Sequence, residues 1–291
     1  MNNVNQNTNC YNPIFIVGTQ RCGTTLLASV LSSNPNIVIT PETTILFKIQ
    51  DVLKVTQDAR TLAYIFTKHE RWNDFSITES MLYKKLKRHS KLNVCNVMNE
   101  FYNCFTEVSG KPRWGDNTPG YSEIILKIID IWPSAYIIHI FRDGRAVAAS
   151  WLNLSWGPKT IEEAAYRWSK RITKCREDSG CVENFFEVRY EDFVSDFFTE
   201  LQKICRFISE SIDQRMLDYF NYDGPDRFRL MTKNPFWDAR KEYHKNILRP
   251  PDPSLIDKWR KVLTQSQVEK FQALTGNLLN DLGYELVGQS K

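Results

Sequence analysis

The sequence predicts an α/β fold built around a central parallel sheet. Short apolar strands alternate with helical segments, which is the pattern of a doubly wound sheet. The longest strand candidate is continuously apolar, as expected where helices cover both faces of a sheet. No internal repeat or low-complexity linker divides the 291 residues, so a single domain over 13–291 is expected.

The strand candidates are short segments rich in β-branched or aromatic residues. They are 14–17, 37–39, 135–141 and 185–189. The segment 135–141, which reads A-Y-I-I-H-I-F, is the strongest of them. In open parallel sheets, ligands bind beyond the carboxyl ends of the strands. The residues that directly follow these strands are therefore the candidate site.

Most of the remaining chain has helical patterns. Apolar residues recur at helical spacing in 24–33, 122–131, 161–176 and 254–282. Gly283 is placed to end the last of these helices. The aromatic-rich segment 44–110 predicts a helical cover over the core, and it ends in a turn-rich stretch, 110–120. The polar, Asn-rich residues 1–12 predict a disordered tail.

Composition excludes several classes of protein. The net charge of +4 is too small to indicate a nucleic-acid partner. No apolar run reaches the length of about 18 residues that a membrane span requires. The seven cysteines include no C-x-x-C pair, so neither a metal site nor a redox motif is expected. Without an apolar leader, the expectation is a cytoplasmic protein, or a secretory-pathway lumenal one if the chain is truncated.

The segment 13–25, P-I-F-I-V-G-T-Q-R-C-G-T-T, is a strand, a loop and the start of a helix. Backbone N–H groups in such a loop point at an anion, and the helix dipole favours negative charge there. A nucleoside triphosphatase would have Lys directly after the second glycine. This chain has Thr24 and Thr25 there, and its nearest cation is Arg21. The loop therefore predicts a phosphate site of another kind, the alternative being a purely structural turn.

A second phosphate clamp is predicted after 135–141. Arg142 follows this strand, and Ser150 lies eight residues further along the next helix. A guanidinium grips a phosphate with two parallel hydrogen bonds, and a hydroxyl adds a third. The alternative is that Arg142 only pairs with an acidic neighbour such as Asp143. Two clamps predict a ligand with two separate phosphate groups.

Four motifs of the chain, in their order along the sequence, resemble signatures of the sulfotransferase superfamily, which uses 3′-phosphoadenosine 5′-phosphosulfate (PAPS). F-I-V-G-T-Q-R-C-G-T-T-L is similar to its 5′-phosphosulfate loop and F-R-D-G-R-A-V-A-A-S to its 3′-phosphate segment. R-Y-E-D-F and the closing W-R and L-G-Y are similar to two further signatures. The resemblance covers about residues 13–285. It implies a P-loop-type three-layer α/β sandwich in which the helical cover binds the acceptor, with adenosine 3′,5′-bisphosphate (PAP) as product and no metal.

The resemblance also implies cofactor-binding roles for individual residues. The loop residues that would hold the 5′-phosphosulfate are Gly18, Thr19, Gln20, Arg21, Cys22, Gly23, Thr24 and Thr25. Arg142 and Ser150 would bind the 3′-phosphate, and Tyr190 would lie near the adenine. Arg249, in N-I-L-R-P, would reach the cofactor as well.

Two residues are the candidates for catalysis. Glu42, in T-P-E-T, occupies the place of the general base in the tyrosylprotein and carbohydrate branches, whose motif layout the chain resembles most. It would take the proton of an acceptor hydroxyl or amine during in-line displacement. Arg21 would stabilise the charge that develops on the leaving oxygen. The alternative for Glu42 is a first-turn charge that favours a helix dipole.

One position departs from the family pattern. Asn117 stands in N-T-P, where the family often has a Lys that assists the leaving group or orients the substrate. This departure leaves open a non-catalytic PAP-binding protein of the same fold. A P-loop kinase is a separate and less favoured alternative, because the loop lacks the Lys of such enzymes. No motif identifies the acceptor, so a tyrosine peptide, a carbohydrate, a lipid and a small molecule are all candidates.

Overall fold

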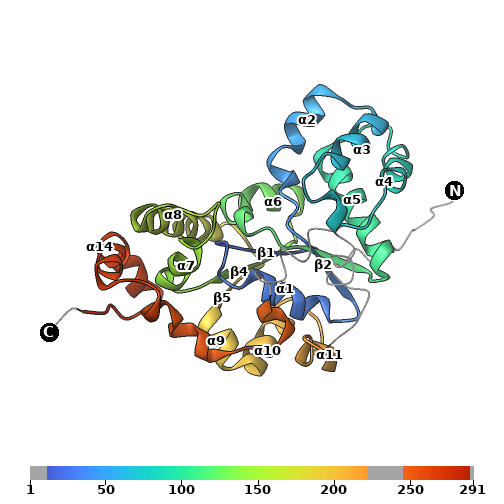
Figure 1. Ribbon diagram of the computed structural model, residues 1–291. Helices are drawn as coiled ribbons and strands as arrows, with labels where there is room; N and C mark the ends of the chain where they lie inside the picture. The colour runs from blue at the N-terminus through green and yellow to red at the C-terminus, as the bar shows by residue number, and fades with distance from the viewer. Residues whose placement is uncertain (1–11, 222–244, 289–291) are drawn as a thin grey trace.

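A computed structural model of the chain describes residues 12–221 and 245–288. At its centre lies a five-stranded parallel sheet with the strand order β2-β3-β1-β4-β5 (Figure 1). The strands are β1 (Ile14–Gly18), β2 (Ile37–Thr40), β3 (Arg113–Asp116), β4 (Tyr136–Phe141) and β5 (Phe185–Arg189). The predicted α/β fold with a central parallel sheet is confirmed. The predicted tail, apart from residue 12, lies outside the described residues.

One central strand lies where the sequence predicts only turns. β3 falls inside 110–120, reads R-W-G-D, and pairs with β1 on one side and β2 on the other. Gly115 permits this pairing, because a Cβ atom there would lie 2.6 Å from the carbonyl oxygen of Ile14. The prediction of turns was wrong because two neighbouring strands and burial, rather than composition, make this segment a strand.

Helices cover both faces of the sheet. The α-helices on the N-terminal half are α1 (Thr24–Ser32), α2 (Ile49–Val55), α3 (Ala59–Thr67), α4 (Glu79–Leu86), α5 (Val94–Ser109), α6 (Ile125–Ile131) and α7 (Gly144–Trp151). Those that follow are α8 (Ile161–Ser179), α9 (Tyr190–Ser195), α10 (Phe197–Phe207), α11 (Gln214–Leu217) and α14 (Gln265–Asp281). The 3-10 helices are η1 (Ile45–Phe47), η2 (Trp72–Asp74), η3 (Pro119–Glu123), η4 (Lys245–Leu248) and η5 (Pro253–Lys261). Together, α2 to α5 form the predicted helical cover, which stands above one end of the sheet in Figure 1.

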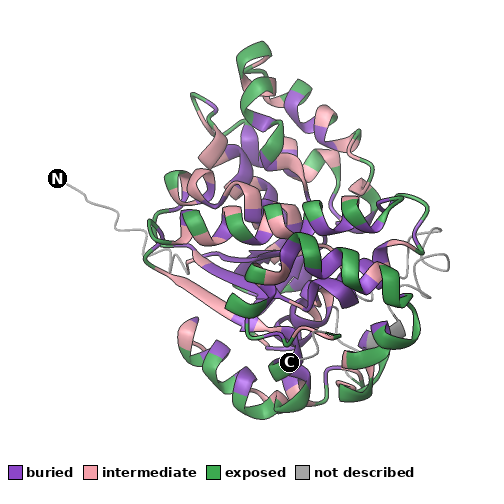
Figure 2. Ribbon diagram, turned by 90° about the vertical axis from the view of Figure 1, so that its left-hand side faces the viewer, coloured by how far each residue is buried: buried purple, intermediate pink, exposed green. Residues whose placement is uncertain are grey.

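The alternation of side chains along each strand divides the core into two parts. In β1, Ile14 and Ile16 pack with α1, α7 and α8, whereas Phe15 and Val17 pack with the aromatic side chains of the helical cover. Figure 2 shows the buried strands between partly exposed helices. This arrangement is the three-layer sandwich, and it leaves the carboxyl edge of the sheet free to hold a ligand.

The predicted helix over 254–282 is divided into η5 and α14. Thr264 separates the two, because its side chain accepts a hydrogen bond from the backbone N–H of Gln267 in a capping box that starts α14. Gly283 ends α14 with φ +77°, a left-handed conformation that favours glycine. The break turns η5 toward the carboxyl edge of the sheet, where it contacts α7 and α9.

A charged cluster between β4 and β5 makes stability depend on pH. Burial acts to raise the pKa of Glu187, but hydrogen bonds from His139 and Arg176 lower it to about 2. Because the folded-state pKa lies below the unfolded one, this stabilisation is present above about pH 4.3 and is lost as the pH falls toward 2. We expect Glu187→Gln to lower the free energy of unfolding at pH 7 by about 1–3 kcal/mol.

Urea unfolding at pH 7 and pH 3 measures this effect. The difference between wild type and Glu187→Gln should shrink at the lower pH. Glu183→Gln, at an exposed site before β5, is the control. Equal destabilisation by Glu187→Gln at both pH values would show that the loss is one of packing rather than of charge.

Candidate active site

The loop between β1 and α1 has a backbone that depends on two glycines. Gly18 has φ +153°, and a Cβ atom there would lie 2.3 Å from the carbonyl oxygen of Ile140. Gly23 has φ +107°, and its Cβ atom would lie 2.5 Å from the ring of Tyr190. Gly23 is also the N-cap of α1, where no side chain of the described residues accepts a capping hydrogen bond. The first amides of α1 and the positive end of its dipole therefore face the carboxyl edge of the sheet.

A cavity of about 400 Å³ opens beside this loop, between α7, the start of α9 and η5. It is lined by Arg21, Arg142, Ala146, Ala149, Ser150, Asn153, Leu154, Tyr190, Arg249, Leu255, Lys258, Trp259 and Val262. Four of these residues are cationic, and the described lining contains no Asp or Glu. The aromatic and apolar side chains form the rest of the wall. Such a cavity is suited to an anion that also carries a flat apolar group.

The arginines of the two predicted clamps lie together. The guanidinium of Arg142 stacks over the ring of Tyr190, at 4.2 Å from the ring centroid, and donates to the carbonyl of Leu255 at 3.3 Å. Its Nε atom is buried and has no hydrogen-bond partner among the described residues. Nε of Arg21 donates to the hydroxyl of Ser150 at 2.9 Å. The loop and α7 thus present their donors to one cavity.

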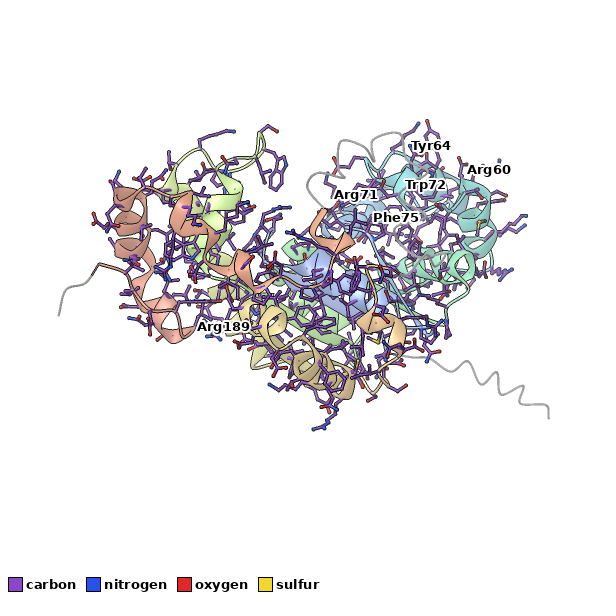
Figure 3. All side chains as sticks on the ribbon, turned by 60° about the horizontal axis from the view of Figure 1, so that its bottom comes forward. Arg60, Tyr64, Arg71, Trp72, Phe75 and Arg189 are labelled. Atoms are coloured by element: carbon purple, nitrogen blue, oxygen red, sulfur yellow. The ribbon has the colours of Figure 1, made fainter. Side chains whose placement is uncertain are left out.

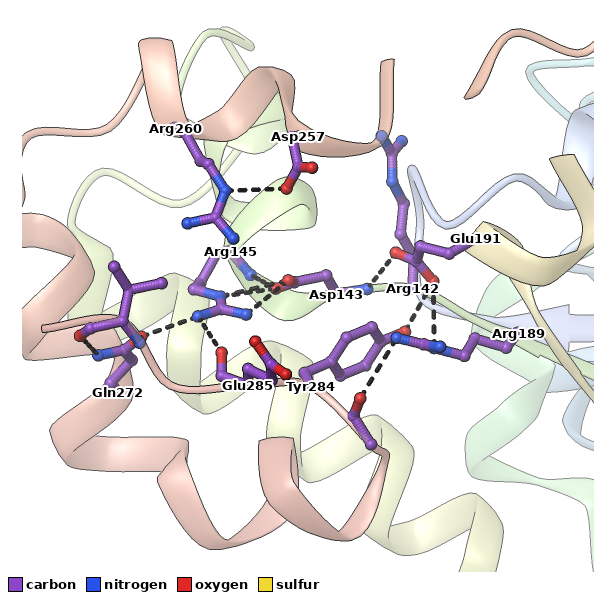
Figure 4. Close-up of polar contacts among 12 residues, drawn as sticks. Arg142, Asp143, Arg145, Arg189, Glu191, Asp257, Arg260, Gln272, Tyr284 and Glu285 are labelled. Atoms are coloured by element: carbon purple, nitrogen blue, oxygen red, sulfur yellow. Dashed lines mark hydrogen bonds and ion pairs between the residues drawn. The ribbon is translucent and has the colours of Figure 1, made fainter. Parts of the chain in front are cut away.

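A buried polar network holds the segment that carries Arg142 (Figure 4). Glu191 accepts from the backbone N–H of Asp143 at 3.0 Å and from the hydroxyl of Tyr284 at 2.9 Å. The carboxylate of Asp143 pairs with Arg145 at 2.8 Å, and Arg145 also donates to Gln272 of α14. The R-Y-E-D and L-G-Y motifs therefore meet behind the cavity. Sequence reasoning identified both motifs but missed this supporting role.

Glu42 lies at the end of β2, as the sequence predicts. It does not line the described cavity, and its carboxylate faces the helical cover, with Oε2 at 3.6 Å from Nη1 of Arg71. Its side chain is 35% exposed. In the sheet order, β3 alone separates β2 from β1, so Glu42 and the loop occupy the same carboxyl edge.

The predicted cofactor-binding residues fall into two groups, those that line the cavity and those that do not. Of the predicted cofactor-binding residues, those that line the cavity are Arg21, Arg142, Ser150, Tyr190 and Arg249. Gln20 accepts a hydrogen bond from Arg171 of α8 instead. Cys22 is fully buried, and burial raises its pKa to about 11, so it packs as a neutral thiol. Thr19 and Thr24 are buried, whereas Gly18, Gly23 and Thr25 shape the loop and the first turn of α1. For these residues, binding through backbone amides stays a prediction.

The position of Lys258 and the burial of Asn117 were not predicted. Lys258 lines the cavity, and the only signal for it is its position directly before the W-R motif. Asn117, at the end of β3, is fully buried, and neither polar atom of its carboxamide has a partner among the described residues. An unpartnered buried amide is costly, so a ligand contact is a physical reason to keep one there.

A model of the sulfotransferase family matches residues 13–214, more than two thirds of the chain. The chain belongs to the sulfotransferase family. It is also 24% identical over 294 residues to the nodulation protein NoeE of Sinorhizobium fredii, a match that covers 93% of this chain. The chain spans 65% of the length of NoeE.

Solved structures show the same fold. The sulfotransferase domain of the Synechococcus PCC 7002 olefin synthase superposes with a TM-score of 0.68 at 22% identity, over 94% of this chain and 96% of that one. The sulfotransferase domain from the curacin biosynthetic pathway gives 0.65 at 20% identity, over 94% and 98%. The mouse sulfotransferase SULT7A1, solved with PAP, gives 0.51 at 17% identity, over 94% and 87%.

No helix among the described residues is long and apolar enough to cross a bilayer. No group of three or more His, Cys, Asp or Glu side chains within 12–221 and 245–288 is placed to hold a metal ion.

Proposed function

We propose that this sulfotransferase takes its sulfuryl group from PAPS and transfers it to a hydroxyl or amine of an acceptor, with Glu42 as general base. The observation that carries this proposal is the cationic cavity, where Arg21 and Arg142 approach from two different strand ends. A donor with phosphate groups at both ends of its ribose matches this pair. The stacked Arg142 and Tyr190 add a planar wall suited to an adenine.

The residues present fit such a ligand. Arg142 keeps a buried Nε–H without a partner among the described residues, and it lines the cavity together with Ser150 of α7. Lys258 and Arg249 add two further cations on the η5 side of the cavity. Because the described lining contains no carboxylate, nothing there opposes the charge of a bisphosphate. This donor set favours a multiply charged anion over a neutral ligand.

When bound, PAPS supplies the sulfuryl group and leaves as PAP. The chain supplies positioning and charge, by analogy with phosphoryl transfer. The carboxylate of Glu42 accepts the proton of the attacking hydroxyl or amine. The guanidinium of Arg21 and the amides at the start of α1 offset the negative charge that develops on the leaving oxygen. Removal of one such donor typically lowers the rate by about 10²–10³-fold.

Transfer of ³⁵S from labelled PAPS to a panel of acceptors tests the proposal. The panel contains a tyrosine peptide, an oligosaccharide, a hydroxylated lipid and simple phenols and amines. Incorporation of ³⁵S into any one class of acceptor supports the function and identifies the acceptor class. Binding of PAP without transfer to any class favours a non-catalytic nucleotide-binding protein. If a parallel assay instead showed transfer of a phosphoryl group from Mg-ATP to an acceptor, the chain would be a kinase.

A further inference from the structure

Glu42 belongs to a short segment, 40–44, that is anchored on its sheet side. The hydroxyl of Thr43 donates to Oδ2 of Asp116 at 2.8 Å, and the backbone N–H of Thr43 donates to the hydroxyl of Thr118 at 2.9 Å. Thr40 adds a longer contact to the same carboxylate. These bonds fix the backbone on either side of Glu42 to the end of β3. They leave the direction of the Glu42 carboxylate to other groups.

The helical cover contacts the same segment from the opposite side. His69 and Arg71 lie in the turn between α3 and η2, and Figure 3 shows Arg71 beside Trp72 and Phe75 of the cover. Nε2 of His69 is 2.9 Å from the hydroxyl of Thr44. Nη1 of Arg71 is 3.6 Å from Oε2 of Glu42. Two residues of the segment, Glu42 and Thr44, are therefore contacted by two nearby residues of the cover.

The hydrogen bonds of His69 define which of its nitrogens donates. Its Nδ1 accepts from the backbone N–H of Arg71 at 3.2 Å, so Nε2 carries the proton and donates to Thr44. Burial lowers the pKa of His69, which favours this neutral form. The side chain of Arg71 is further fixed by Asp74, at 2.8 Å from its Nε, and only 13% of it is exposed. Both contacts to 40–44 thus come from side chains that are themselves held in place.

The backbone conformation of Thr44 is strained, so the segment 40–44 needs contacts that stabilise it. Its φ is +51°, in the left-handed region that β-branched residues rarely adopt. Strained residues persist where the surroundings hold them, and they are concentrated at functional sites. The hydrogen bond from His69 is the contact on the Thr44 side chain that opposes relaxation of this turn.

We propose that His69 and Arg71 are positioning residues for Glu42: His69 holds the strained turn at Thr44, and Arg71 fixes the direction of the Glu42 carboxylate. This inference rests on the proposed role of Glu42 as the base. The helical cover then has a second task besides binding the acceptor, because it sets the geometry of proton removal. A general base is effective only within hydrogen-bond reach of the proton that it takes.

Steady-state kinetics with the acceptor found in the panel test the role of Arg71. We expect Arg71→Gln to lower kcat about 10-fold or more, since misplaced catalytic groups cost factors of up to about 10². The KM for PAPS should stay within about 2-fold, because Arg71 does not line the cavity. Arg71→Lys, which keeps the charge, should recover part of the loss. Arg60→Gln, on α3 of the same cover and stacked on Tyr83, is the control.

A double variant separates this inference from the proposed function. If Arg71 acts through Glu42, Arg71→Gln should add little in a Glu42→Asp background, where the shorter carboxylate no longer reaches the same position. Full additivity of the two losses, or a kcat of Arg71→Gln equal to that of Arg60→Gln, would overturn the positioning role. Full activity of Glu42→Gln would instead reject the base itself.

Hydrogen exchange measured by mass spectrometry tests His69 without an acceptor. In His69→Ala, exchange over 40–47 should rise, while exchange over the loop 18–25 and the Kd for PAP stay as in wild type. Unchanged exchange over 40–47 would contradict the role given to His69. The PAP titration also shows whether the variant is folded.

Discussion

Replacing Glu42 with glutamine is expected to lower the rate of sulfuryl transfer by about 10²–10⁴-fold, the usual contribution of a general base. Glutamine has nearly the same shape but cannot accept the proton of the attacking group. The Kd for PAP should not change, because Glu42 does not line the cationic cavity. Single-turnover transfer of ³⁵S from PAPS, together with calorimetric titration of PAP, measures both quantities.

Two further variants make this prediction specific. Glu42→Asp keeps the carboxylate but shortens the side chain, so it should retain more activity than Glu42→Gln. Glu70→Gln removes an exposed carboxylate from the same helical cover and should have no effect on transfer. A Glu42→Gln enzyme as fast as Glu70→Gln would show that another group takes the proton.

Replacing Arg142 with glutamine is expected to weaken PAP binding by about 10–10²-fold, the value of a charged hydrogen-bond donor. Binding of 5′-AMP, which has no 3′-phosphate, should change far less. The two nucleotides would then bind with similar affinity to the variant, although wild type favours PAP. Calorimetric titration of each nucleotide into wild type and Arg142→Gln gives this comparison.

Arg142→Lys and Arg167→Gln complete the series. Lysine keeps the charge but loses both the planar fork and the stacking on Tyr190, so Arg142→Lys should recover only part of the affinity. Arg167, on the exposed side of α8, pairs only with Glu163 among the described residues and should be neutral. If Arg142→Gln weakened the binding of 5′-AMP and of PAP equally, Arg142 would contact the nucleotide without recognising its 3′-phosphate.

The parts of the fold that could be predicted are those whose signals lie within a short stretch of the sequence. The strand over 14–18 and its loop have unambiguous signals, an apolar run and two glycines at fixed spacing. β3 has no such signal. Its buried Arg113 and Asp116 have partners distant in the sequence, Glu210 and Thr40 among them. The split of 254–282 was also hidden. Apolar spacing continues across Thr264, and only its capping box divides the helix.

The same distinction holds at the site. The sequence placed Arg21 and Arg142 after strand ends and Ser150 in the helix that follows Arg142, and the fold brings all three to one cavity. Sequence alone could not show that Glu191 supports Asp143, because this contact joins residues on two different strand ends. Nor could it show that Arg71 reaches Glu42, since the helical cover has no motif of its own. Contacts made by tertiary structure alone were the ones that sequence reasoning missed.

Calorimetric titration with PAP, 5′-AMP and Mg-ATP is the measurement that tests the donor site most directly. If Arg21 and Arg142 form two phosphate clamps, PAP should bind at least about 10-fold more tightly than 5′-AMP, without any need for magnesium. Equal affinity for PAP and 5′-AMP, or a preference for Mg-ATP, would contradict PAPS as the sulfuryl donor.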